Sequence, residues 1–107
     1  MTLSELTDKR IHFIGLGGAG MSGIARIMLA QGISISGSDA KDSAVLSGLK
    51  TLGAQVFIGH QESNIGDADI LVVSSAIDQS NPEITAASAK GLTIMTRAQA
   101  LALLMSE

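Results

Sequence analysis

Hydrophobic and polar positions alternate along this chain with two different periods. Short apolar runs, typical of buried strands, recur between longer stretches whose apolar residues are spaced as on one face of a helix. The short runs predict five strands, at residues 11–14, 33–36, 55–58, 70–74 and 92–95. The longer stretches predict four helices, at about residues 19–31, 43–52, 81–90 and 96–105.

Two of the predicted helices begin with recognisable capping residues. Asn81 is a good N-cap, Pro82 fits the first helical position, and Glu83 would meet the positive end of the helix. Thr96 and Gln99 have the spacing of a capping box. These signals fix where the third and fourth helices begin.

Alternating strands and helices predict an α/β fold, a Rossmann-like three-layer domain with a five-stranded parallel sheet. The run "ILVV" at residues 70–73 predicts a central strand buried on both faces. Residues 60–69 are polar and replace a full crossover helix or contain a short one, so the strand order could reverse there. We expect residues 1–107 to form a single domain that binds its ligand at the carboxyl ends of the strands.

Composition narrows the function classes. The net charge is −3 and no basic cluster is present, which argues against nucleic-acid and anionic-membrane partners. The absence of cysteine excludes disulfides and thiolate metal sites. No apolar run approaches the roughly 18 residues of a membrane span, and the polar start is unlike a signal peptide, so we expect a cytoplasmic protein. We expect no metal site, because neither histidine shows metal-ligand spacing with a carboxylate. We expect no catalytic residue, because no Ser-His-Asp order and no lysine nucleophile context stands out.

A glycine-rich loop carries the strongest chemical signal. In "GLGGAGMSG", Gly15, Gly17 and Gly20 have the Gly-x-Gly-x-x-Gly spacing between a predicted strand and a predicted helix. The first glycine would allow a tight turn, the second a close approach of an anion, and the third close packing of helix on strand. The free N–H groups of the helix start favour a phosphate. The spacing predicts a bound diphosphate, does not say of which nucleotide, and leaves a purely structural role for the glycines open.

Other candidates lie at predicted strand ends. Asp39 follows Gly20 by 19 residues and is either a ribose-binding carboxylate or a turn residue. The segment Ser74–Ile77 is either a sugar- or phosphate-binding loop or an ordinary strand exit. His60 would border a base or lie in solvent. His12 falls inside the first strand, where we expect a packing or edge position.

The segments "GLGGAGMSGIA", "SGSD", "GAQVFIGH" and "VVSSAI" resemble the N-terminal domain of the Mur ligase family of peptidoglycan synthesis. The resemblance covers about residues 10–105. It implies a UDP-sugar-binding domain of a three-domain ligase, followed by an ATPase domain and a C-terminal domain. The implied reaction is the ATP-dependent joining of L-alanine to the lactyl carboxylate of UDP-N-acetylmuramate.

The resemblance also implies that ATP and Mg²⁺ bind outside this chain, which would hold no cofactor of its own and would not catalyse the reaction alone. The implied partners are UDP-N-acetylmuramate and the remaining ligase domains. The alternative on the same glycines and carboxylate is an NAD(P)-binding domain of an oxidoreductase or of a redox-sensing regulator.

Residue roles follow from the resemblance position by position. The amides of residues 18–22 and the Ser22 hydroxyl would cradle the diphosphate, Asp39 would read the uracil or its ribose, and His60 would border the base. Residues 75–77 would line the path to the sugar. The full set of expected UDP-sugar contacts is Gly15, Gly17, Gly18, Ala19, Gly20, Met21, Ser22, Asp39, His60, Ser74, Ser75, Ala76 and Ile77.

Overall fold

The computed structural model describes residues 2–106 and contains five strands, four α-helices and two 3₁₀ helices in this part of the chain. The strands are β1 (Arg10–Ile14), β2 (Ser34–Asp39), β3 (Gln55–Ile58), β4 (Ile70–Val73) and β5 (Thr93–Thr96). The helices are η1 (Leu3–Leu6), α1 (Met21–Ala30), α2 (Ala44–Thr51), η2 (Glu62–Ile65), α3 (Pro82–Ala89) and α4 (Arg97–Met105).

All five strands form one parallel sheet in the order β3-β2-β1-β4-β5. The chain builds outward from β1 to β3, then returns through η2 to place β4 on the other side of β1. The predicted reversal of strand order within residues 60–69 is therefore confirmed, and so is the predicted α/β Rossmann-like fold. The reversal leaves the carboxyl ends of β1 and β4 side by side, which is where open parallel sheets bind ligands.

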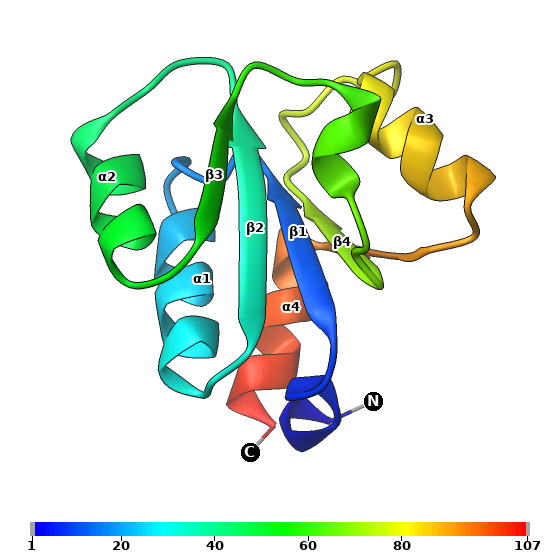
Figure 1. Cartoon of the computed structure of the whole chain (residues 1–107). Helices are drawn as coiled ribbons and strands as arrows, with labels where there is room; N and C mark the ends of the chain where they lie inside the picture. The colour runs from blue at the N-terminus through cyan, green and yellow to red at the C-terminus, as the bar shows by residue number, and fades with distance from the viewer. Residues whose placement is uncertain (1, 107) are drawn as a thin grey trace.

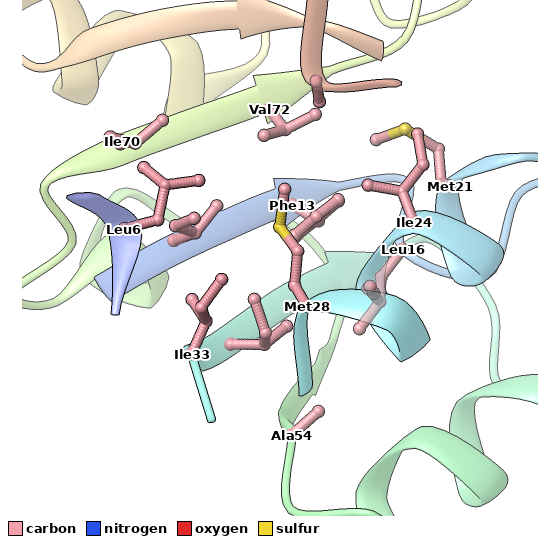
Figure 2. Close-up of a cluster of buried hydrophobic side chains, with 14 of the residues drawn as sticks. Leu6, Phe13, Leu16, Met21, Ile24, Met28, Ile33, Ala54, Ile70 and Val72 are labelled. Carbon is pink, nitrogen blue, oxygen red and sulfur yellow. The ribbon is translucent and has the colours of Figure 1, made fainter. Parts of the chain in front are cut away.

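Helices cover both faces of the sheet (Figure 1). The α1, α2 and α4 side holds the larger hydrophobic cluster, and the η2 and α3 side holds a smaller one. Successive side chains of β1 point to opposite faces of the sheet. Ile11 and Phe13 therefore belong to the larger cluster, and Ile14 belongs to the smaller one. Figure 2 shows Phe13 beside Met28 of α1 in the larger cluster, where neither side chain is exposed to solvent.

The predicted capping residues at the starts of α3 and α4 are confirmed, whereas α1 begins at Met21, two residues later than predicted. The Asn81 side chain accepts a hydrogen bond from Glu83 N, with Pro82 at the first position of α3. The Thr96 and Gln99 side chains each bond the other residue's backbone N–H and form a complete capping box.

Strand β2 is longer than the predicted 33–36, because it runs to Asp39. Gly37, Ser38 and Asp39 lack the apolar character on which the prediction relied. They are in the strand because their backbones pair with β1 or β3, Ser38 lying opposite Ile14. Gly37 is needed there, since a Cβ at this position would lie 2.7 Å from Leu16 Cδ2 and 2.9 Å from Phe13 O. Among residues 2–106, no helix is long and apolar enough to cross a membrane.

Candidate functional site

The glycine loop connects β1 to α1 at the carboxyl edge of the sheet. Gly15 has φ +81° and Gly20, the N-cap of α1, has φ +82°, a backbone region that side chains disfavour. The amides of Gly15 and Leu16 both donate to Ser38 O, at 2.8 and 3.1 Å. The loop is therefore anchored on the end of β2.

The loop leaves only some of its amides free. Gly18 N donates to Gly15 O at 2.9 Å, and Met21 N and Ser22 N donate to Gly18 O at 3.1 and 3.3 Å. Within the described chain, Ala19 N and Gly20 N have no acceptor. Unpaired amides at a helix N-terminus are suited to binding an anion. The predicted role of residues 18–22 as a diphosphate cradle stays a prediction, and these two amides are its best donors.

An arginine side chain that was not among the predicted site residues lies beside this loop. A Cβ at Gly20 would lie 3.0 Å from Nη1 of Arg97, the first residue of α4. Arg97 is exposed and forms no ion pair with any residue in the range 2–106. We expected Gly20 to allow close packing of helix on strand, but the group nearest to it is the Arg97 guanidinium. The glycine that allows close packing is Gly37. An arginine directly after the carboxyl end of a strand was the signal available for finding Arg97.

Asp39 lies at the end of β2, half-buried against the glycine loop. Its Oδ2 accepts a hydrogen bond from Gly17 N at 2.9 Å and its Oδ1 one from Ala40 N at 2.8 Å. A Cβ at Gly17 would lie 3.0 Å from the same Oδ2. In this structure the carboxylate orients the loop, and contact with a ribose or uracil stays a prediction.

The Ser74–Ile77 segment follows β4 and lies against the glycine loop. Ile77 N donates to Ser74 O at 3.2 Å and closes a turn. A Cβ at Gly15 would lie 3.3 Å from Ile77 Cδ1. Ser75 and Ala76 are exposed on this turn. The fold thus brings two of the predicted segments together beyond the carboxyl ends of the neighbouring strands β1 and β4.

His60 belongs to a chain of polar groups that enters the η2 and α3 side of the sheet. Its Nδ1 lies 2.9 Å from Ser38 Oγ. Ser38 Oγ donates to Glu83 Oε1 at 2.7 Å, and His12 Nε2 donates to the same oxygen at 2.6 Å. Three of these four side chains, those of His12, Ser38 and Glu83, are fully buried.

The second carboxylate oxygen of Glu83 is also fully engaged. Oε2 accepts hydrogen bonds from Gln61 N at 3.1 Å and Asn64 Nδ2 at 3.0 Å, and lies 3.5 Å from His60 Nδ1. Burial raises the pKa of Glu83, but the hydrogen bonds from His12, Ser38 and Asn64 and the charge of His12 outweigh it, bringing this pKa to about 2. The carboxylate is therefore ionised throughout the neutral range.

The sequence did not reveal this polar cluster. Glu83 is in the first turn of α3 as predicted, but its carboxylate faces inward and holds three parts of the chain together. His12 has the predicted packing position, whereas the edge alternative was wrong, because β1 is the central strand. The two histidines share Glu83 as a partner despite their uninformative spacing. In the described chain no group of three or more His, Cys, Asp or Glu residues is arranged to hold a metal ion.

A five-stranded parallel sheet with a reversal of strand order beside β1, and a glycine loop between β1 and α1, define a Rossmann-like class of protein. The family model described as "Mur ligase family, catalytic domain" matches residues 10–107. This chain belongs to the Mur ligase family, which confirms the resemblance drawn from the sequence.

Named relatives agree with this assignment. The chain is 57% identical to the UDP-N-acetylmuramate–L-alanine ligase of Thermobifida fusca, over 98% of this chain and 24% of that protein. It is 56% identical to the ligase of the same name from Renibacterium salmoninarum, over 96% of this chain and 22% of that protein. The chain thus spans less than a quarter of the length of these curated relatives.

Solved structures place the fold in the same family. The UDP-N-acetylmuramate-alanine ligase from Thermotoga maritima matches with a TM-score of 0.81 and 32% identity, over 84% of this chain and 21% of that chain. A regulator in complex with NADP matches with a TM-score of 0.70 at 12% identity, over 84% of this chain and 33% of that chain, which shows a shared fold alone.

Proposed function

We propose that this chain binds the UDP part of UDP-N-acetylmuramate for a ligase that joins this nucleotide sugar to L-alanine. The proposal is supported by curated relatives more than 50% identical that carry this activity in their names. The single structural observation that carries it is the pair of unpaired amides at Ala19 and Gly20 next to the Arg97 guanidinium.

Each part of the loop matches a need of a diphosphate. The amides supply directed donors and the α1 dipole supplies partial positive charge at the same point. Arg97 adds a full charge with a planar set of donors suited to phosphate oxygens. The sugar beyond the diphosphate would run along Ser75, Ala76 and Ile77, and the uridine would lie toward Asp39 and His60.

The full reaction is proposed for the longer protein. There, ATP and Mg²⁺ would activate the lactyl carboxylate in domains outside residues 1–107, and this chain would present the substrate to them. We propose a cytoplasmic setting for that reaction, as part of peptidoglycan synthesis. The contribution of this chain is binding and orientation.

Ligand titration of the chain tests the proposal. UDP-N-acetylmuramate, UDP and NAD would each be added while the amide signals are followed by NMR and the heat by calorimetry. We expect the Ala19 and Gly20 amides to shift with both uridine ligands. Tighter binding of NAD than of either uridine ligand would contradict the proposal and favour the dinucleotide-binding alternative.

A further inference from the structure

The buried carboxylate of Glu83 has no role in the proposed diphosphate contact, yet it is linked to the ligand-binding edge. We propose that Glu83 is a positioning residue: acting through Ser38, it fixes His60 in the Nδ1–H tautomer, so that His60 Nε2 meets the bound nucleoside as a hydrogen-bond acceptor. This inference rests on the proposed function, because it takes a uridine nucleotide as the ligand of the glycine loop.

Counting protons along the chain of groups gives the tautomer. The ionised Glu83 carboxylate can only accept, so the single Ser38 hydroxyl proton is donated to Oε1. Ser38 Oγ is left with lone pairs toward His60 Nδ1, 2.9 Å away. That contact is a hydrogen bond only if Nδ1 carries the proton. The negative Oε2, 3.5 Å from the same Nδ1, favours the same arrangement.

The other ring nitrogen of His60 is open to a ligand. The His60 side chain is 22% exposed, and its Nε2 forms no hydrogen bond with any residue in the range 2–106. The described chain contains no buried side-chain nitrogen or oxygen without a partner, so Nε2 is accessible to solvent. His60 also lies near the glycine loop, since Ser38 bonds both His60 and the amides of Gly15 and Leu16.

Because His60 Nε2 is an accessible acceptor, it favours a ligand that places a hydrogen-bond donor against it. In a uridine nucleotide the available donors are the imide N3–H of the base and the ribose hydroxyls. Cytosine has a bare N3 at the same position and would face Nε2 with a second acceptor. If the imide is the donor, the tautomer discriminates uridine from cytidine; if a ribose hydroxyl is, both nucleotides use it equally.

The substitution Glu83→Gln would reverse the direction of the hydrogen bonds. Asn64 Nδ2 and Gln61 N are donors, so the amide oxygen must take the Oε2 position and the NH₂ group the Oε1 position. Ser38 Oγ then accepts from this NH₂ group and donates to His60 Nδ1. His12 Nε2, which donates to Oε1 in the wild type, must then accept the second NH₂ proton and carry its own proton on Nδ1, toward Ser36 Oγ. His60 is left with its proton on Nε2.

The NMR test reads the tautomer directly. The ring ¹⁵N shifts of His60 would be measured in the 107-residue chain at about pH 8.5, where free imidazoles are neutral. We expect the Nδ1–H form in the wild type, the Nε2–H form in Glu83→Gln, and no change in Glu62→Gln, an exposed carboxylate of η2 that makes the same charge change.

Binding measurements give the second readout and separate the two donors. We expect Glu83→Gln to weaken UDP binding roughly three- to tenfold, the cost of one lost hydrogen bond, while Glu62→Gln does not. If the base is the donor, N3-methyl-UDP shows the same loss in the wild type and Glu83→Gln narrows the preference for UDP over CDP. If the ribose is the donor, the deoxyribose analogues show the loss instead.

The outcomes distinguish this inference from the proposed function. An Nε2–H tautomer in the wild type overturns the inference. So does a result in which the wild type binds N3-methyl-UDP and the deoxyribose analogues as tightly as UDP. Should Glu83→Gln fail to fold, Ser38→Ala replaces it, and an unchanged tautomer and UDP affinity there would be equally contradictory. Absence of any uridine-nucleotide binding refutes the proposed function and the acceptor role with it, while the tautomer measurement still decides whether Glu83 positions His60.

Discussion

The glycine loop and the polar cluster around Glu83 lie on either side of Ser38, and they satisfy their polar groups in opposite ways. Ser38 O anchors the loop, and Ser38 Oγ belongs to the cluster. Among residues 2–106, the Ala19 and Gly20 amides of the loop and the neighbouring Arg97 side chain have no protein partner, while Glu83 uses both carboxylate oxygens for buried hydrogen bonds. The comparison indicates that the hydrogen bonds of the buried cluster are complete within the protein, whereas the donors at the loop are available to a ligand.

Removing the centre of the buried cluster tests the buried half of this comparison and has the largest expected effect. Glu83→Ala leaves the donors on His12, Ser38 and Asn64 without their acceptor in a buried setting. We expect a loss of about 3–5 kcal/mol in the free energy of unfolding, measured by urea denaturation. Glu62→Ala is the matched control with no expected loss. A loss below about 1 kcal/mol would show that water replaces the carboxylate.

Acid titration probes the same carboxylate without a substitution. The pKa of Glu83 is about 2 in the folded chain against 4.5 for the free side chain. Because the folded value is the lower one, the stabilisation is complete above pH 4.5 and is lost as the pH falls toward 2, about 3 kcal/mol in all. Stability measured between pH 5 and pH 2 should show this fall in the wild type and a smaller one in Glu83→Gln. If the free energy of unfolding fell equally steeply with pH in the two proteins, the low pKa of Glu83 would be contradicted.

The sequence predicted the sheet and missed the cluster for the same physical reason. Strand and helix patterns are local, so β4 follows from its apolar run and α4 from its capping box. The bond between His12 and Glu83 joins residues 71 positions apart, and no local pattern reports it. A glutamate in the first turn of a helix is already explained by its favourable interaction with the helix dipole. The local pattern therefore offered no reason to expect that Glu83 is buried.

The candidate site was predictable in outline but not in its hydrogen bonds. Spacing predicted the edge at which the loop lies, and its position after a predicted strand made Ser74–Ile77 a candidate, which the fold sets beside Gly15. Which amides stay free depends on local turns, such as the bond from Gly18 to Gly15 O. Arg97 reaches Gly20 only because α4 begins at the edge where α1 also begins, a consequence of the strand order.

A pair of glycines with the same backbone angle separates folding from binding at the open edge. Gly20 and Gly32 have φ +82° and +83°, and alanine at either position is strained by about 1–2 kcal/mol. A Cβ at Gly32 meets nothing within 4 Å, whereas one at Gly20 meets Arg97. We expect both alanine variants to lose similar stability in urea and only Gly20→Ala to lose UDP affinity. Equal affinities would show that the loop does not receive the ligand.

The smallest expected effect belongs to the arginine at the open edge. Arg97→Gln keeps a long polar side chain on the exposed first residue of α4, so the stability of the chain should change little. If the guanidinium contacts the diphosphate, UDP affinity should fall about tenfold, and the dependence of that affinity on salt should become shallower because one charge contact is lost. Arg26→Gln is the control, since Arg26 lies beside Gly48 of α2 and carries the same charge. A uniform loss in both variants would mean that net charge alone attracts the ligand. A loss confined to Arg97 would show that the edge of the sheet holds a specific anion site, open where the Glu83 cluster is closed.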